Sequence, residues 1–265
     1  MASMTKKTLF TVFLISSIAI PAALLSALAI GTDNKPLLSR PEGPCDIYAK
    51  SGTPCVAAHS STRALYASYD GPLYQVMRES DRKTLDIGVV PPSELDPGGY
   101  ADAEAQDKFC AGTTCWITII YDQSGKGNHL EQAPRGAFIG AALGGFNTLP
   151  IANMAPVTLS GHKVYGVYFI PGMGLRQNDT HGVAVDDQAE GQYWVINGHH
   201  YNSGCCFDYG NAETDSRDDG DGTMETTYYG NQPLWFHGEA PGPWIMTDKE
   251  NNLIGCVNPD PNDKY

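Results

Sequence analysis

Short runs of β-branched and aromatic residues, bounded by turn-forming residues, constrain the fold of this chain most strongly. Such side chains pack well on a pleated surface and therefore favour β-strands. The chain has 29 glycines and 18 prolines but only 18% charged residues, which suits many short strands joined by turns. This pattern predicts an all-β antiparallel sandwich and argues against a doubly wound α/β fold, which needs long helices between its strands. The predicted strands are Trp116–Tyr121, Val164–Ile170, Gln192–Asn197 and Thr223–Tyr229.

Helical signal is confined to the early part of the chain. We expect one short helix to open at Ser61–Tyr66 and a second to span Ala101–Phe109. Turn sequences follow two of the predicted strands, at Asp122–Gly125 and Gly230-Asn231. No internal repeat or low-complexity linker occurs after residue 43, so a single domain is the simplest prediction.

The N-terminus has the features of a secretory signal peptide. Lys6 and Lys7 precede an uncharged run, Thr8–Thr32, that contains an Ala27-Leu28-Ala29 cleavage pattern. The run is long enough to span a bilayer, so an uncleaved signal anchor is the alternative, although Pro21 favours cleavage. We therefore predict a secreted, extracellular protein without stable membrane association after cleavage. The expected segments are a signal peptide over residues 1–29, a spacer or pro-segment over 30–42, and one domain over 43–265.

Secretion changes how the seven cysteines are interpreted. In an oxidising compartment they favour disulfides over metal sites. Cys45 and Cys55 could close a short loop, and Cys110 and Cys115 a tighter one. Cys256 has no obvious partner, and an odd count indicates either a free thiol or an incomplete chain.

The surface chemistry expected from the sequence narrows the class of partner. A net charge of −13 repels nucleic acid and anionic membranes. It is compatible with a neutral substrate such as a sugar, although acidity also simply keeps a secreted protein soluble. Asn178 begins an N-glycosylation sequence, Asn178-Asp179-Thr180, which predicts a glycosylated surface loop. We expect a monomer that binds no nucleic acid.

The segment Gly242–Asn252 has the most chemical content. If it is a strand, its side chains alternate between two faces. The carboxylates Asp248 and Glu250 then share a face, and they raise each other's pKa if that face lines a cleft. Such pairs are candidate catalytic sites, and the alternative is a strand end with two solvated acids. The same face would carry Trp244 and Met246, and the other face Ile245, Thr247 and Lys249.

The adjacent cysteines Cys205-Cys206 are the second chemical feature. A disulfide between neighbours needs a distorted peptide, and such strain persists mainly where a ligand site imposes it. The ring would present a flat, polarisable face suited to stacking on a sugar. On spacing alone, separate pairing or free thiols are the simpler interpretation.

Neither of two possible metal motifs fits a known site. The acidic stretch Asp215–Gly222 lacks the EF-hand spacing and is better explained as a solvated turn. His199 and His200 would point to opposite faces of a strand, which favours a structural or substrate-rim role over zinc. The chain also lacks a Gly-rich phosphate loop, a G-x-S-x-G elbow and a dinucleotide fingerprint. We therefore predict no metal and no cofactor.

Several stretches resemble the fungal α-L-arabinofuranosidase B proteins of glycoside hydrolase family 54. They span about residues 43 to 254 in family order, and the two most specific are Cys205–Glu213 and Gly242–Leu253. The others are Gly43–Tyr48, Thr53–Ser60, Ile119–Gly125 and Gly127–Leu130.

The resemblance implies a concanavalin-like β-sandwich (jelly roll) that releases terminal L-arabinofuranose from plant cell-wall arabinan and arabinoxylan with retention of configuration. By motif position, Glu250 resembles the nucleophile. The implied substrate-binding residues are Cys205, Cys206, Trp235, Asp248, Asn251 and Asn252. The implied disulfides are Cys45–Cys55, Cys110–Cys115 and a vicinal bridge between Cys205 and Cys206.

Retaining chemistry needs a second carboxylic acid besides the nucleophile. The family supplies an aspartate from a Gly-Gly-Asp-Asn-type motif downstream, and no such motif follows Glu250 here. The resemblance also implies further strands and a C-terminal β-trefoil beyond this sequence. Asp248 would flank the sugar rather than reach its leaving group. We therefore expect this chain alone to turn over little or no substrate.

Two other function classes are possible. Without its acid, the same sandwich could act as a non-catalytic module that binds arabinofuranosyl groups. A thiol–disulfide redox role for Cys205-Cys206 has little support, because the C-x-x-C spacing and the βαβ context are missing.

Overall fold

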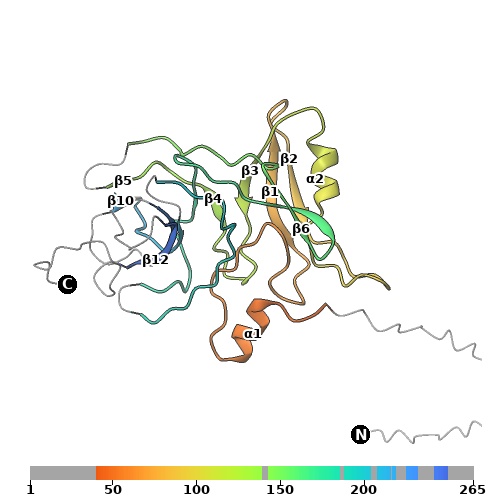
Figure 1. Ribbon diagram of the computed structural model, residues 1–265, viewed down its shortest axis with the longest axis horizontal. Helices are drawn as coiled ribbons and strands as arrows, with labels where there is room; N and C mark the ends of the chain where they lie inside the picture. Colours follow the sequence, from red (N-terminus) through yellow and green to blue (C-terminus); the bar gives the residue numbers. More distant parts are fainter. Residues whose placement is uncertain are drawn as a thin grey trace, which may run out of the picture. The chain divides into compact units, whose positions relative to one another are not determined.

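The computed structural model describes residues 40–138, 143–185, 188–203, 208–215, 217–218, 225–231 and 242–249. All of these lie in one compact unit, Leu38–Tyr265. Over them the chain is mostly β, with small antiparallel sheets and two short helices (Figure 1). The predicted predominance of antiparallel β-structure is therefore confirmed. Within this part of the chain, no helix has the length and apolar character needed to cross a bilayer.

The largest sheet described has five strands, and each neighbouring pair is antiparallel. Its middle strand confirms the strand predicted over Trp116–Tyr121, shifted by one residue. In spatial order the strands are β2 (Thr84–Gly88), β1 (Pro72–Arg78), β3 (Cys115–Ile120), β4 (Leu130–Gln132) and β8 (Leu175–Arg176).

Two further pairings involve strands that lie between β4 and β8 in the sequence. The hairpin β6 (Ala155–Leu159) and β7 (His162–Gly166) is antiparallel, and β7 confirms a strand near Val164–Ile170 that starts earlier and ends at Gly166. The pair β5 (Ala137–Phe138) and β10 (Arg217–Asp218) is parallel.

The third sheet contains residues 244–249, which carry the first of the two paired carboxylates, Asp248. Its strand order is β12-β11-β9, and both pairings are antiparallel. The central strand confirms the prediction over Thr223–Tyr229 within the described residues. The bounds are β9 (Asp208–Gly210), β11 (Glu225–Gly230) and β12 (Trp244–Lys249).

The two helices are α1 (Pro44–Lys50) and α2 (Ala103–Phe109). The second confirms the helix expected over Ala101–Phe109 but starts two residues later. Asp102 is its N-cap, and the Asp102 carboxylate accepts a hydrogen bond from Ala105 N at 2.9 Å. The preceding residue, Ala101, instead donates its N–H to Thr62 O, outside the helix.

The main core lies beside the five-stranded sheet, where Figure 1 shows α2 next to β2. Tyr74 on β1 is fully buried, and its hydroxyl donates to Gln106 Oε1 at 2.6 Å. Gln106 on α2 then donates to Ala152 O at 3.0 Å. A satisfied polar pair therefore links the helix to the sheet inside an otherwise apolar core.

The helix expected at Ser61–Tyr66 is wrong, because these residues form bends and a β-bridge. Ala64 N donates to Gly99 O at 2.7 Å, and Leu65 N donates to Gln123 Oε1 at 2.7 Å. Both N–H groups are thus bound to distant partners and are not available within a helix. Tertiary hydrogen bonds override the local helical preference here.

The strand expected over Gln192–Asn197 is also not formed among the described pairings. Side-chain exposure does alternate along the segment, with Tyr193 and Val195 on its exposed side. However, Gln192 contacts β11 through its side chain, whose Nε2 donates to Glu225 O at 2.9 Å. A side-chain contact therefore takes the place of a backbone ladder.

Two of the three expected disulfides lie within the described residues, and both are confirmed: Cys45–Cys55 and Cys110–Cys115. The first joins α1 to a small buried cluster that contains Ala58 and Leu65. The expected vicinal bridge, Cys205–Cys206, and the unmatched Cys256 lie outside the described residues.

The cap of α2 gives a direct test of this packing. We expect Asp102→Ala to lower the free energy of unfolding by about 1 kcal/mol, because the N–H of Ala105 loses its acceptor. Asp102→Asn keeps an acceptor oxygen and should change stability by a few tenths of that amount. Urea denaturation of both variants checks this, and equal losses would show that charge rather than capping matters.

Candidate active site

Of the segment Gly242–Asn252, residues 242–249 are described, and Trp244–Lys249 form the strand β12, as predicted. On β12, Asp248 lies opposite Thr226 and Trp244 lies opposite Gly230 in the antiparallel register with β11. The strand predicted for this segment is therefore confirmed over positions 244 to 249, and the shared face of Asp248 and Glu250 stays a prediction.

The remaining predicted site residues adjoin this sheet in sequence but lie outside the described residues. The antiparallel register places the start of β9, the end of β11 and the start of β12 at one end of the sheet. Lys249, the residue before Glu250, lies at the other end. By sequence, Cys205 and Cys206 precede β9, Trp235 lies between β11 and β12, and Glu250, Asn251 and Asn252 follow β12.

The central strand β11 is buried on both faces. Thr226 and Tyr228 on one face are each 4% exposed, and Glu225 and Tyr229 on the other are 3% and 5% exposed. Both faces of the strand are therefore covered by other parts of the protein, and Glu225 and Thr226 are buried although they are polar.

One face of β11 is covered by the segment that follows residue 188. Tyr229 Oη donates to Gly198 O at 2.7 Å. Gln192 Nε2 donates to Glu225 O at 2.9 Å, and Thr227 Oγ1 donates to Gln192 Oε1. These hydrogen bonds hold β11 in place on this face without any contribution from a substrate.

A contact across 150 residues of sequence links β9 to the N-terminal part of the domain. His59 Nδ1 lies 2.8 Å from the hydroxyl of Tyr209, which is the middle residue of β9. His59 Nε2 lies 2.6 Å from Asn128 O. The two rings meet edge to face, with centroids 5.9 Å apart.

Behind His59 lies a buried carboxylate, Asp122, which is only 5% exposed. It accepts hydrogen bonds from Ala58 N at 2.8 Å, from the N–H and hydroxyl of Ser124 at 2.9 and 2.6 Å, and from Asn128 N at 3.1 Å. Burial alone would raise the pKa of Asp122. The hydrogen bonds from Ser124, Ala58 and Asn128 outweigh that effect and hold the pKa below its ordinary value.

Asn128 extends this arrangement and is 2% exposed. Its Nδ2 donates to Val56 O at 2.8 Å and to His181 O at 3.0 Å, and its Oδ1 accepts from His181 N at 2.7 Å. We call Asp122 and Asn128, with the groups they bond, the polar hub. The sequence predicted Asp122–Gly125 as a turn and as part of a stretch that resembles the family, but it gave Asp122 no role, because the partners of its carboxylate include Ala58, far away in the sequence.

The predicted glycosylation site is half-buried. Asn178 Oδ1 accepts a hydrogen bond from Arg176 Nε at 2.6 Å. Burial lowers the pKa of Arg176, and the nearby carboxylates Glu213, Asp215 and Asp208 act in the opposite direction. Glycosylation at Asn178 remains a prediction.

The two histidines considered as metal ligands have other contacts. His200 Nε2 lies 2.6 Å from Phe169 O, and its ring stacks on Tyr168 with centroids 4.0 Å apart. The backbone N–H of His199 donates to Asn197 Oδ1. In the part of the chain that is described, no three His, Cys, Asp or Glu side chains group as metal ligands.

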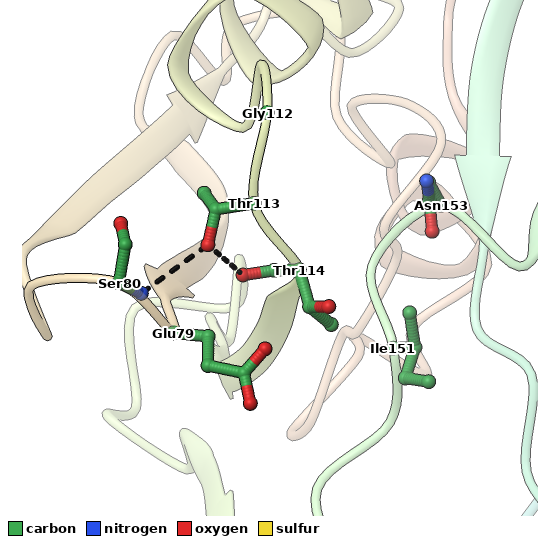
Figure 2. A pocket seen from close by; sticks show the side chains of 7 residues that line it. All are labelled: Glu79, Ser80, Gly112, Thr113, Thr114, Ile151 and Asn153. Atoms are coloured by element: carbon green, nitrogen blue, oxygen red, sulfur yellow. Dashed lines mark hydrogen bonds between the residues drawn. The ribbon is translucent and has the colours of Figure 1, made fainter.

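A shallow hollow lies far in sequence from these residues, beside the end of β1 and the start of β3 (Figure 2). Ser80 N donates to Thr113 Oγ1 at 3.2 Å, and Thr113 Oγ1 donates to Thr114 O at 3.3 Å. Its polar groups therefore partly satisfy one another, and it brings together none of the predicted site residues. The lining consists of Glu79, Ser80, Gly112, Thr113, Thr114, Ile151 and Asn153.

The polar hub predicts an acid-sensitive stability. Asp122→Asn should lower the free energy of unfolding by about 3 kcal/mol at pH 7, because an amide replaces acceptor oxygens that face N–H and O–H donors. The folded pKa of Asp122 is lowered, so its stabilisation is present above about 3.9, the ordinary value, and is lost as pH falls through the folded pKa.

Urea denaturation at pH 7 and pH 3 measures this difference between wild type and Asp122→Asn. The difference in free energy of unfolding between the two proteins should be smaller at pH 3 than at pH 7. An equal difference at both values would contradict a stabilising role for the ionised carboxylate of Asp122. Asp86→Asn, which changes an exposed carboxylate that accepts from Tyr121 Oη at 2.8 Å, is the matched control and should stay within about 0.5 kcal/mol.

Comparison with known proteins places the chain among arabinofuranosidases. The family model described as "Alpha-L-arabinofuranosidase B, catalytic" matches residues 44–265. The probable α-L-arabinofuranosidase B of Aspergillus fumigatus is 59% identical over 220 residues, which are 83% of this chain and 42% of that protein. The α-L-arabinofuranosidase of Hypocrea jecorina is 57% identical, over 82% of this chain and 42% of that protein.

Solved structures agree. A glycoside hydrolase family 54 α-L-arabinofuranosidase soaked with a cyclic sulfate inhibitor is 58% identical, with a TM-score of 0.73. An arabinofuranosidase complexed with arabinofuranosyl-α-1,2-xylobiose is 57% identical, also with a TM-score of 0.73. Each match covers 80% of this chain and 43% of the other, so this chain spans about two fifths of the length of these relatives. The chain belongs to the α-L-arabinofuranosidase B catalytic-domain family, which is a family of glycoside hydrolases.

Proposed function

We propose that this chain is catalytic sequence of a secreted, retaining α-L-arabinofuranosidase in which Glu250 is the nucleophile. The match of the family model to residues 44–265 carries the proposal. The strand β12 adds support, because the residue that directly precedes Glu250 in the sequence, Lys249, is paired in the antiparallel sheet. The concanavalin-like sandwich is the finer fold proposed, by similarity to family structures.

The proposed substrate is a terminal α-L-arabinofuranosyl group on a plant cell-wall polysaccharide such as arabinoxylan or arabinan. A relative's complex with arabinofuranosyl-α-1,2-xylobiose supports this substrate class. The net charge of −13 suits a neutral polysaccharide better than an anionic partner. We propose a secreted monomer, and the two disulfides support an oxidising compartment.

The proposed roles follow the family motif. Cys205 and Cys206, joined as a vicinal disulfide, would offer an apolar face to the sugar ring, and Trp235 would stack on it. Asp248, Asn251 and Asn252 would hydrogen-bond the sugar hydroxyls next to the nucleophile. Asp248 lies on the extended strand β12 and is two residues before Glu250 in the sequence, which is consistent with such flanking contacts.

The chemistry proposed for Glu250 is attack by its ionised carboxylate on the anomeric carbon, which forms a glycosyl-enzyme and expels the leaving oxygen. A second carboxylic acid must protonate that oxygen and later activate water, about 5–5.5 Å from the nucleophile. A reagent whose leaving group needs no proton isolates the step that belongs to Glu250.

A cyclic sulfate of arabinofuranose configuration is such a reagent, because a sulfate oxygen can leave without taking up a proton. A family 54 structure was soaked with a cyclic sulfate inhibitor, so this class of reagent suits the family. Attack by Glu250 forms a bond to the anomeric carbon and breaks its bond to a sulfate oxygen, while the sulfate stays on the sugar. We expect intact mass spectrometry to show one added reagent mass on the chain, and peptide mapping to place it on Glu250.

Glu250→Gln should abolish this labelling, because an amide is a poor nucleophile. Glu79→Gln, in the hollow of Figure 2, is the matched control and should label at the wild-type rate. Labelling at another residue would overturn the assignment of Glu250. Binding of arabinofuranosyl-α-1,2-xylobiose by calorimetry, with neither labelling nor hydrolysis, would favour the non-catalytic binding module instead.

A further inference from the structure

We infer that His59 is a positioning residue for the arabinofuranose subsite, because through Tyr209 it holds β9, the strand that follows Cys205-Cys206 in the chain. The inference rests on the proposed function, since the subsite is part of that proposal. The structure contributes the link between His59 and β9.

The tautomer of His59 follows from its two partners. Asn128 O is a carbonyl oxygen and can only accept, so Nε2 at 2.6 Å carries the proton. In the neutral ring Nδ1 is then an acceptor, and the Tyr209 hydroxyl must donate to it across 2.8 Å. Tyr209 therefore donates a hydrogen bond to His59, and His59 donates one to Asn128 O.

The ionisation states of both side chains agree with this direction. Burial lowers the pKa of His59, which keeps the ring neutral, although Asn128 O and the Asp122 carboxylate act against burial and His129 acts with it. Burial, aided by the charge of Asp122, raises the pKa of Tyr209, so its hydroxyl keeps the proton that it donates.

His59 is fixed to the polar hub by its backbone as well as by its ring. It forms an antiparallel β-bridge with Asp122, and the N–H of its neighbour Ala58 donates to the Asp122 carboxylate at 2.8 Å. The base of the link is thus rigid, so a displacement of Tyr209 cannot easily be absorbed by movement of His59.

The strand at the other end of the link is short and depends on such support. Within the described residues, β9 has three residues and lies at the edge of its sheet, where it pairs only with β11. A short edge strand forms few backbone hydrogen bonds with its neighbour, so a buried side-chain hydrogen bond contributes a large share of the free energy that keeps it in place. The anchor residue, Tyr209, is three positions after Cys206.

Two variants test the link: one removes the hydroxyl that donates the hydrogen bond, and the other removes the ability of residue 59 to become protonated. Tyr209→Phe deletes the donor and leaves His59 Nδ1 without it. His59→Gln offers a donor to Asn128 O and an acceptor to Tyr209 but cannot be protonated. The matched controls are Tyr165→Phe, which removes a hydroxyl bound to Asp107 at 2.6 Å, and His162→Gln, on β7.

Two measurements on the full chain separate the parts of the inference. Hydrogen exchange of peptides that cover residues 204–213 reports the hold on β9. The rate of Glu250 labelling by the cyclic sulfate reports the subsite. We expect Tyr209→Phe to raise exchange and to slow labelling, each about tenfold, which is the loss of one buried hydrogen bond. His59→Gln and both controls should remain within about threefold of wild type.

A pH series adds a readout that a passive packing role would not change. The groups that face His59 are Asp122, His129 and Tyr209. Because the folded pKa of His59 is lowered from 6.5, the opened form binds more protons below that pH. Exchange of residues 204–213, corrected for its intrinsic pH dependence, should rise from pH 7 to pH 5 in wild type and stay level in His59→Gln.

Each outcome tests a different part of the inference. Unchanged exchange in Tyr209→Phe overturns the inference, whatever the labelling shows. Faster exchange with unchanged labelling also overturns the positioning role but leaves the assignment of Glu250 intact. If wild type is not labelled, the proposed function fails, and the link from His59 to β9 is then judged by exchange and its pH series alone.

Discussion

The buried carboxylate of Asp122 is the interaction on which the rest of this structure depends. An ionised carboxylate that lost its partners in the interior would cost several kcal/mol, so the surrounding backbone must keep its N–H groups directed toward it. Those donors belong to Ala58, Ser124 and Asn128, which join the early part of the domain to the connection between β3 and β4. One charge therefore orders segments that lie far apart in sequence.

A chain of hydrogen bonds connects this polar hub to β9. Asn128 O orients the ring of His59, His59 accepts from Tyr209, and Tyr209 sits in the middle of β9. The next strand, β11, is buried on both faces, so its register with β9 and β12 is strongly specified. The sheet that adjoins the proposed catalytic residues is thus held from the side opposite to β12.

The elements predicted correctly from the sequence are those whose signals are local. The branched run of β3, the capped helix α2 and the alternating β12 each carry their own pattern. The two failures, Ser61–Tyr66 and Gln192–Asn197, are segments whose hydrogen bonds go to residues far away in the chain. Asp122 was missed as a hub for the same reason, since its partners include Ala58, 64 residues earlier.

The register of β12 also bears on why Asp248 and Glu250 should have different roles. Neighbouring positions on one face of a strand are about 6.6 Å apart along it, so two carboxylates at positions 248 and 250 of a continuous strand would approach a bound sugar from the same side. A nucleophile and a general acid must instead act on opposite sides of the bond that breaks. We therefore propose that Asp248, which lies opposite Thr226 in the ladder, binds sugar hydroxyls and that the proton for the leaving group comes from a carboxylic acid on another element.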